Sequence, residues 1–192
     1  MMTKADSIGR ESIHSMLRIG KSRIAIGRAI EVAARSRPNP KPSWLIECLW
    51  DDDPATASRA AHALELVTRD GQPGPIAQLN SVNSSLLGLL PEAGEDKLRW
   101  HLALIVPRLT LGRTECARAV QSLEARLEDR SSSIVKTMAL QGLVDLTRQN
   151  HGLLARVLGL VRVYGRSGTA AMRARSRLLL ERLEKKSGSE PN

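Results

Sequence analysis

The residues of this chain best suited to bind a charged partner are arginines near its C-terminal end. Two of them, Arg173 and Arg177, lie one turn apart on a predicted helix. Guanidinium groups bind phosphates and carboxylates, so the cluster could serve a nucleic acid or an acidic protein. A second interpretation stays open, because the last element of an elongated stack needs a polar outer face to remain soluble. The cluster consists of Arg156, Arg162, Arg166, Arg173, Arg175, Arg177 and Arg182.

Side chains that could support catalysis or bind a metal are few and scattered. A zinc site needs about four convergent ligands, but the histidines do not approach one another at helical spacing, and none lies near a cysteine in the sequence. The run Asp51–Asp53 could recruit a cation, but helix capping explains it without one. We therefore predict no catalytic residue, no metal, no cofactor and no enzymatic activity. The histidines are His14, His62, His101 and His151.

Composition and charge favour a helical protein with two basic ends. The net charge is +9, yet residues 43–92 hold seven acidic and two basic residues, whereas residues 131–192 hold eleven basic and four acidic ones. The chain has no Phe and one Tyr, so its interior must be aliphatic. Cys48 and Cys116 lie in apolar runs and are interpreted as buried thiols. Without a signal peptide or a membrane span, a cytoplasmic protein is expected.

The helices that must position these residues form a repeat. A basic residue opens each of five predicted helices, at steps of 36, 40, 37 and 37 residues. The residue seven positions later is apolar in every copy, and the residue three positions later is usually small or apolar. A period in the high thirties is typical of a helical solenoid. The five basic residues are Arg23, Arg59, Arg99, Lys136 and Arg173.

The best-formed copy is the helix predicted over residues 133–146. Its residues Val135, Ala139, Leu143 and Leu146 fall on one helical face. A second set of helices is predicted between the copies. The last of these is almost entirely apolar, so we expect it to be buried on most sides. The predicted ranges of the second set are 8–19, 43–50, 75–90, 113–127 and 153–164.

The second helix of each pair resembles the HEAT-repeat family of α-solenoids. The shared pattern is an acidic or capping turn, followed by an apolar residue, a basic residue and then Ala and Leu at helical spacing. The segment Ile134–Leu143 fits best, with Asp129 in the preceding turn, and Leu98–Val106 after Asp96 fits next. Three copies depart from it: Arg59 is followed by His62 where Ala is usual, Arg173 by Ser176, and Arg23 lacks an acidic turn.

The resemblance implies an all-α superhelix of about four to five helix pairs, with the second helices lining a concave surface. It covers a single domain over residues 1–184, followed by a flexible tail at 185–192. In the family, the acidic turn residue and the helix basic residue form a ladder between neighbouring repeats. The expected repeats span 8–37, 43–70, 75–111, 113–149 and 152–184. The ladder would pair Asp53, Asp96 or Asp129 with Arg59, Arg99 or Lys136.

Three hypotheses about function follow from these observations. The first is a non-catalytic scaffold that binds a protein, possibly an acidic one, through the concave face. The second is nucleic-acid binding through a basic face. The third is a protein similar to the HEAT-like alkylpurine DNA glycosylases, in which Trp100 beside Arg99 would face DNA, although no matching catalytic Asp is present. The candidate contacts for a partner or a phosphate are Arg99, Trp100, Lys136, Arg173 and Arg177. The sequence does not indicate the partner's identity or the oligomeric state.

Overall fold

The chain folds into helices throughout the part described by the computed structural model, which is residues 4–19, 26–27, 29–30, 43–69, 73–128 and 132–187. These residues contain ten α-helices and no strand, so the all-α prediction is confirmed. Short 3-10 turns follow α3 and α7 and precede α10. The helices are α1 (Lys4–Ile19), α3 (Ser43–Glu47), α4 (Pro54–Thr68), α5 (Pro73–Asn80), α6 (Asn83–Glu92), α7 (Asp96–Ile105), α8 (Arg113–Leu127), α9 (Ser133–Leu146), α10 (Leu154–Ser167) and α11 (Ala170–Ser187).

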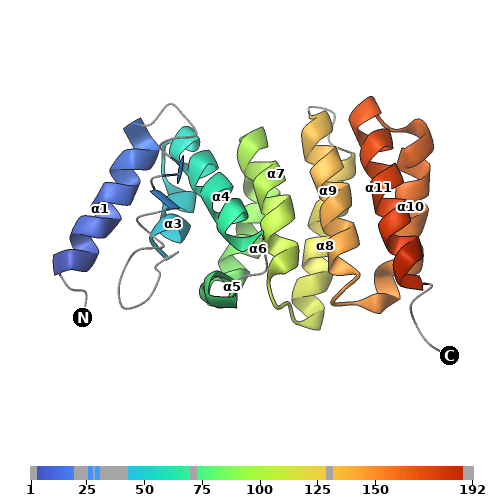
Figure 1. The fold of residues 1–192 in the computed structure, drawn as a ribbon, viewed down its shortest axis with the longest axis horizontal. Helices are drawn as coiled ribbons and strands as arrows, with labels where there is room; N and C mark the ends of the chain where they lie inside the picture. Colours follow the sequence, from blue (N-terminus) through green and yellow to red (C-terminus); the bar gives the residue numbers. More distant parts are fainter. Residues whose placement is uncertain are drawn as a thin grey trace.

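Four helices form a row in chain order. Figure 1 shows α4, α7, α9 and α11 side by side, with α6, α8 and α10 behind them. Each helix of the front row packs against the next one, and α8 and α10 join the row by packing on α9 and α11. The helices α1 and α11 lie at opposite ends (Figure 1). The helices of the front row therefore follow one another in space in the same order as along the chain.

The side-chain hydrogen bonds between elements have a narrow range of sequence separation. The shortest joins Asn80 to Thr110, 30 positions apart, and the longest joins Glu65 to Arg108, 43 positions apart. The others of this group among the described residues span 32 to 42 positions, including those from Arg156 to Glu124 and from Gln149 to Pro107. This range brackets the steps of 36 to 40 residues found in the sequence.

Polar residues in the turns before α4 and α9 cap the N-termini of these two helices. Asp53 accepts hydrogen bonds from the backbone N–H groups of Ala55 and Thr56, and Pro54 occupies the first turn of α4. Ser132 accepts from the backbone N–H of Val135 at the start of α9. These side chains satisfy amide groups that would otherwise lack a partner at a helix N-terminus.

Helix α9 is the most enclosed element of the row. Its predicted core residues Val135, Ala139, Leu143 and Leu146 are fully buried, but so are residues on its other faces. At Gly142 the helix approaches α7 so closely that a Cβ atom would lie 2.4 Å from the carbonyl oxygen of Ala103. The single apolar stripe predicted for this helix was too narrow, because α7, α8, α10 and α11 all pack on it.

Two other expectations about helices were wrong. The helix expected over 75–90 is two helices, α5 and α6, because the polar residues between them form a turn in which the Ser81 hydroxyl donates to the Gln78 carbonyl. Helix α10 is not buried on most sides: only Val157 and Val161 are buried, and Val163 is 56% exposed. It packs on α9 and α11 at the end of the described stack, so its other faces stay open.

The predicted end regions are only partly described. Helix α11 continues to Ser187, beyond the expected start of the tail at residue 185, and residues 188–192 lie outside the described part. Nearly half of the predicted first repeat, residues 8–37, also lies outside it. Among the repeat residues, Arg23 falls in that region, as does Asp129 of the expected ladder.

Candidate interaction groove

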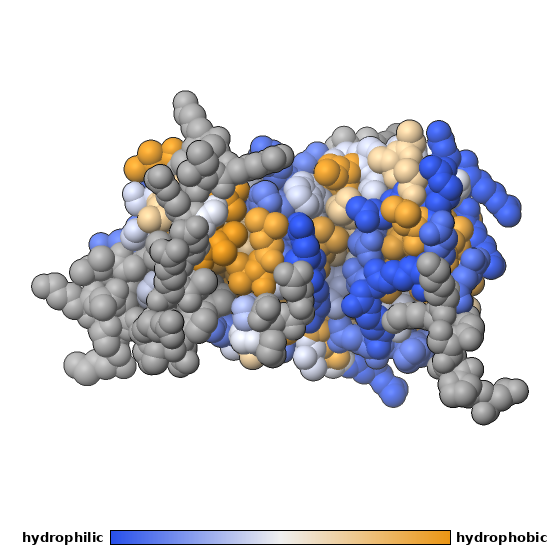
Figure 2. Space-filling view, in the orientation of Figure 1, coloured by the Kyte–Doolittle hydropathy of each residue, from blue (hydrophilic) through white to orange (hydrophobic). Residues whose placement is uncertain are grey.

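An open groove of roughly 1080 Å³ runs across the face formed by α4, α7, α9 and α11. Figure 2 shows this face with hydrophobic residues over α4 and α7 and a band of hydrophilic residues over α9 and α11. We call this feature the charged groove. Its charged and amide lining residues are Glu65 and Arg69 from α4, Arg108 after α7, Gln141, Asp145, Arg148 and Gln149 on and after α9, and Arg175 and Arg182 from α11.

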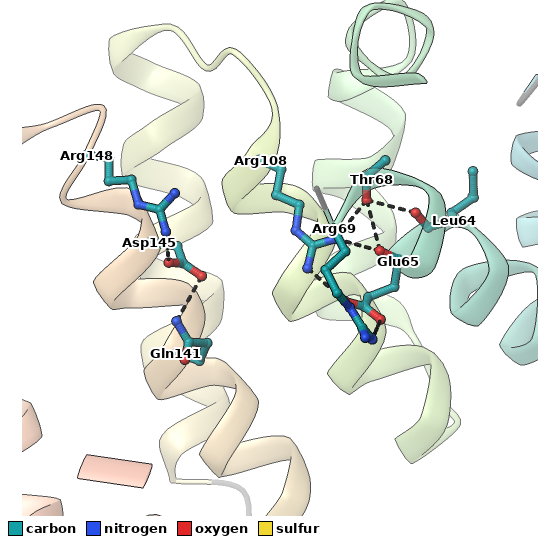
Figure 3. A network of polar contacts seen from close by, with 8 residues as sticks. All are labelled: Leu64, Glu65, Thr68, Arg69, Arg108, Gln141, Asp145 and Arg148. Atoms are coloured by element: carbon teal, nitrogen blue, oxygen red, sulfur yellow. Dashed lines mark hydrogen bonds and ion pairs between the residues drawn. The ribbon is translucent and has the colours of Figure 1, made fainter. Parts of the chain in front are cut away.

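The first ion cluster of the groove surrounds Glu65 (Figure 3). The side chain of Glu65 is 3% exposed, and both of its oxygens accept charge-assisted hydrogen bonds. Arg69 Nη2 lies 2.7 Å from Oε2, and Arg108 Nη2 lies 2.8 Å from Oε1. Arg108 also donates to the backbone carbonyl of Glu65 and to the Thr68 hydroxyl. The cluster therefore joins α4 to the end of α7.

The two arginines keep Glu65 ionised. Burial alone would raise the pKa of this carboxyl, but the hydrogen bonds and charges of Arg69 and Arg108 outweigh it and lower the pKa below 4.5. A buried carboxylate remains charged only when it is paired in this way. Glu65 thus fixes the direction of both guanidinium groups.

The second ion cluster surrounds Asp145. Arg182 Nη2 on α11 lies 2.7 Å from Oδ1, and Arg148 Nη2 lies 2.9 Å from the same oxygen. Gln141 donates to the other oxygen, Oδ2, at 3.0 Å. Figure 3 shows that Arg148, Asp145 and Gln141 lie along one side of α9. This cluster repeats the chemistry of the first one, an aspartate or glutamate held between two arginines.

A second pocket, of roughly 890 Å³, lies between the opposite ends of α4 and α7 and contains three rings. His62 and His101 stack with their centroids 4.8 Å apart, and the Trp100 and His101 centroids are 3.4 Å apart. His101 is 2% exposed, and its Nδ1 has no hydrogen-bond partner among the residues that the structure describes. Desolvation lowers the pKa of His101 to about 3, and the charge of His62 acts in the same direction. His101 is therefore neutral at physiological pH.

The five predicted contact residues do not line the charged groove. Arg99 donates to the carbonyl of Ala93 at 2.7 Å, and Arg173 donates to the carbonyl of Gly168 at 2.7 Å, so each guanidinium is bound to the turn before its own helix. The other three differ in exposure: Trp100 is half-buried in the ring cluster, Lys136 is half-buried without a hydrogen bond or ion pair to any described residue, and Arg177 is exposed.

The ladder expected from the HEAT resemblance is not formed as predicted among the described residues. Asp53 uses both carboxylate oxygens to cap its own helix, so Arg59 instead donates to the carbonyls of Leu17 and Arg18 at the end of α1. Asp96 pairs with Arg99 at 3.3 Å, but within one turn of α7. Asp129, the expected partner of Lys136, lies outside the described residues.

The C-terminal arginines do not form one continuous patch. Arg156 pairs with Glu124 at 2.5 Å, and Arg182 pairs with Asp145, so both bind the chain itself. Arg162 and Arg166 are exposed on α10, behind the front row, whereas Arg175 lines the groove. The cluster seen in the sequence is therefore divided between two faces of the last helix pair.

The sequence held a signal for the groove that the predictions did not use. Nine positions after Arg59, Arg99, Lys136 and Arg173, a polar residue stands in each of these four predicted copies. Because the side chains at one repeat position stack on one another, these residues could have been predicted to meet. They are Thr68, Arg108, Asp145 and Arg182, and the structure joins the first two and the last two by hydrogen bonds.

Comparison of the chain with family models, curated proteins and solved structures found no match in any of the three. Within the described residues, no three His, Cys, Asp or Glu side chains group together as a metal ion would require. No described helix combines the length and apolar character needed to cross a membrane. The proposal about function therefore rests on the groove and the helix row.

Proposed function

We propose that the chain is a HEAT-like solenoid that acts as a non-catalytic scaffold and binds a protein partner through the charged groove. The repeat spacing supports the solenoid. In a stack of repeats each unit contacts only its neighbours, so contacting residues differ by about one period. The hydrogen bonds between elements span 30 to 43 positions, as such a stack requires.

The observation that carries the binding function is the pair of ion clusters in the groove. Each holds exposed guanidinium groups in a fixed direction by means of a less exposed carboxylate. Groups held in place before binding lose less conformational entropy when a partner arrives. Arginine is also enriched at the energetically important centres of protein interfaces.

Apolar side chains on the same row add to the binding surface. Ile134 at the start of α9 is 46% exposed and lines the ring pocket with Trp100, and Leu178 on α11 is 59% exposed. Protein interfaces combine exposed apolar and aromatic residues with arginine in this manner. A partner that covered the row would bury these side chains beside the charged groove.

The scaffold function is tested by affinity capture from native extract with three forms of the full chain. The groove variant carries Arg148→Glu and Arg175→Glu. The control variant carries Arg162→Glu and Arg166→Glu, with the same charge change on α10. A defined protein should be recovered with the wild type and the control but lost with the groove variant. Equal recovery with all three forms, or no recovered protein at all, would contradict the proposal.

Nucleic-acid binding through the same face is the second candidate. It is favoured by the charge of the groove, whose lining has five arginines against two carboxylates. This function predicts that a fluorescent oligonucleotide binds the wild type and that log affinity falls linearly with log salt concentration. If the oligonucleotide binds equally well to the groove and control variants, the groove is not a nucleic-acid site.

A further inference from the structure

We infer that the end of the charged groove formed by α9 and α11 binds a phosphorylated side chain of the protein partner, through Arg148, Arg175 and Arg182. The inference rests on the proposed function and deepens it, because it names the chemical group that the partner presents. Arg148 follows α9, Arg175 and Arg182 lie on α11, and all three line the groove. We call these three arginines the phosphate site.

Asp145 brings two of the three arginines together. The Nη2 atoms of Arg182 and Arg148 lie 2.7 Å and 2.9 Å from the same carboxylate oxygen, Oδ1. The other oxygen accepts a hydrogen bond from Gln141 at 3.0 Å. The side chain of Asp145 is 17% exposed, whereas those of Arg182 and Arg148 are 34% and 54% exposed. Two positive charges therefore lie side by side above a carboxylate that is less exposed than either of them.

The third arginine has no carboxylate of its own. Arg175 is half-buried in the lining of the groove and makes no hydrogen bond or ion pair with any residue that the structure describes. Besides Asp145, the described lining holds one carboxylate, that of Glu65. Glu65 is already bound by Arg69 and Arg108 in the first ion cluster. A half-buried charge is less well solvated than an exposed one, so Arg175 gains more from an anionic ligand than a surface arginine would.

The charge of the site matches a phosphate monoester. Three arginines and one carboxylate leave two positive charges uncompensated. A phosphorylated serine or threonine carries about −1.5 to −2 charges at pH 7 and has three acceptor oxygens, which guanidinium forks bind in pairs. A carboxylate side chain brings one charge and two oxygens, and each phosphodiester of a nucleic acid brings one charge. The monoester neutralises the site, whereas the other two groups leave a positive charge behind.

The apolar side chains around the site favour a peptide over a nucleic acid. Leu178 lies three positions after Arg175 and four before Arg182, so it shares their face of α11, and it is 59% exposed. Met138 lines the groove from α9. A nucleic acid would place a further charge against these side chains at every nucleotide. A peptide can place apolar residues beside its phosphorylated residue and cover them.

The test is isothermal titration of the full chain, at about 150 mM salt, with four short peptides that differ at one position between two leucines. The position holds phosphoserine, glutamate, serine, or phosphoserine whose phosphate is a methyl diester. We expect the phosphoserine peptide to bind at least tenfold more tightly than the glutamate and diester peptides, and the serine peptide to give no measurable heat. Equal affinity for the phosphoserine peptide and either charged competitor would overturn the inference.

Matched variants separate the site from the net charge of the protein. Arg148→Gln with Arg175→Gln removes two of the three arginines and leaves Arg182 on Asp145. This variant should lose at least tenfold in affinity for the phosphoserine peptide. Arg162→Gln with Arg166→Gln makes the same charge change at exposed positions of α10 and should alter the affinity less than twofold. Equal losses in the two variants would contradict the site, and thermal melts establish that both variants are folded.

Inorganic phosphate distinguishes a phosphorylated protein from a small phosphorylated molecule. Phosphate alone can reach the arginines but leaves Leu178 and Met138 uncovered, so it should bind at least tenfold more weakly than the phosphoserine peptide. If phosphate binds as tightly as the peptide, the surrounding surface adds nothing and the site does not serve a protein partner.

Failure of the inference and failure of the proposed function have different signatures. Capture of the partner from native extract is repeated after the extract has been treated with a protein phosphatase, and the captured protein should then be lost. If capture depends on the groove but survives the phosphatase, the inference fails and the scaffold function stands. If no captured protein depends on the groove, the proposed function fails and the inference fails with it.

Discussion

Arg108, in the turn after α7, lies 2.8 Å from the carboxylate of Glu65 on α4, 43 positions earlier in the chain. In the same way, the ion pair between Asp145 and Arg182, which are 37 positions apart, joins α9 to α11. These pairs link successive helices of the row and also form the floor of the charged groove. The contacts that hold the stack together are thus part of the surface proposed to bind a partner.

Replacing Arg108 should destabilise the stack more than replacing a solvent-exposed arginine of the same groove. Arg108→Ala leaves the buried Glu65 with one arginine in place of two, and we expect unfolding to become easier by about 2–3 kcal/mol. Arg148→Ala, at an exposed position, should cost about 1 kcal/mol or less. Urea unfolding at pH 7 measures both variants. Equal losses would show that the Glu65 cluster does not hold α4 to α7.

His101 should make the protein less stable as the pH falls from neutral. The folded protein keeps this ring neutral until its pKa of about 3, whereas the unfolded chain protonates it near 6.5. The unfolded state therefore binds more protons between these values, and stability decreases with acidification by up to about 1.4 kcal/mol per pH unit.

The variant His101→Leu isolates this effect. Its unfolding free energy should change less than that of the wild type between pH 6.5 and pH 5, in urea titrations at several pH values. Measurement above pH 5 avoids the titration of Glu65. Because the pKa of Glu65 is lowered in the folded protein, its contribution to stability is lost only at more acidic pH. Parallel pH curves for the two proteins would mean that His101 is not buried as a neutral ring.

Two glycines in helices should respond oppositely to the same substitution. Gly142→Ala places a methyl group 2.4 Å from the Ala103 carbonyl oxygen, so α7 and α9 must separate, at a cost of about 1–3 kcal/mol. Gly159, inside α10, has open space around its Cβ position, so Gly159→Ala should stabilise by about 0.5–1 kcal/mol. Thermal melting of both variants gives the comparison, and a stabilising Gly142→Ala would refute the close contact.

The helices and their buried faces were predictable because they depend on local periodicity. The predicted core residues Val135, Ala139, Leu143 and Leu146 are buried as expected, and so are Cys116, Val120, Leu123 and Leu127 of α8. Periodicity on one helix does not reveal how many neighbours that helix has. For this reason the enclosure of α9 and the exposure of α10 were both missed.

The candidate site was harder to predict because its residues come from helices that are far apart in the sequence. His62 was noted as a departure from the repeat pattern and Trp100 as a candidate contact. They are 38 positions apart, and the structure places them in one pocket. Asp145 and Arg182 are likewise far apart in the sequence, at 37 positions, and are joined by a hydrogen bond in the structure. The expected pairing of Asp53 with Arg59 is absent for a local reason, since the carboxylate of Asp53 is used by its own helix.

The most direct test of binding through the charged groove is site-specific photo-crosslinking in native extract. A photoreactive residue is placed in the groove by Met138→p-benzoylphenylalanine and, as a control, on the exposed side of α8 by Arg118→p-benzoylphenylalanine. The proposed function predicts one defined protein joined to the chain from position 138 and not from position 118. Crosslinks from position 118 alone, or from neither position, would contradict it.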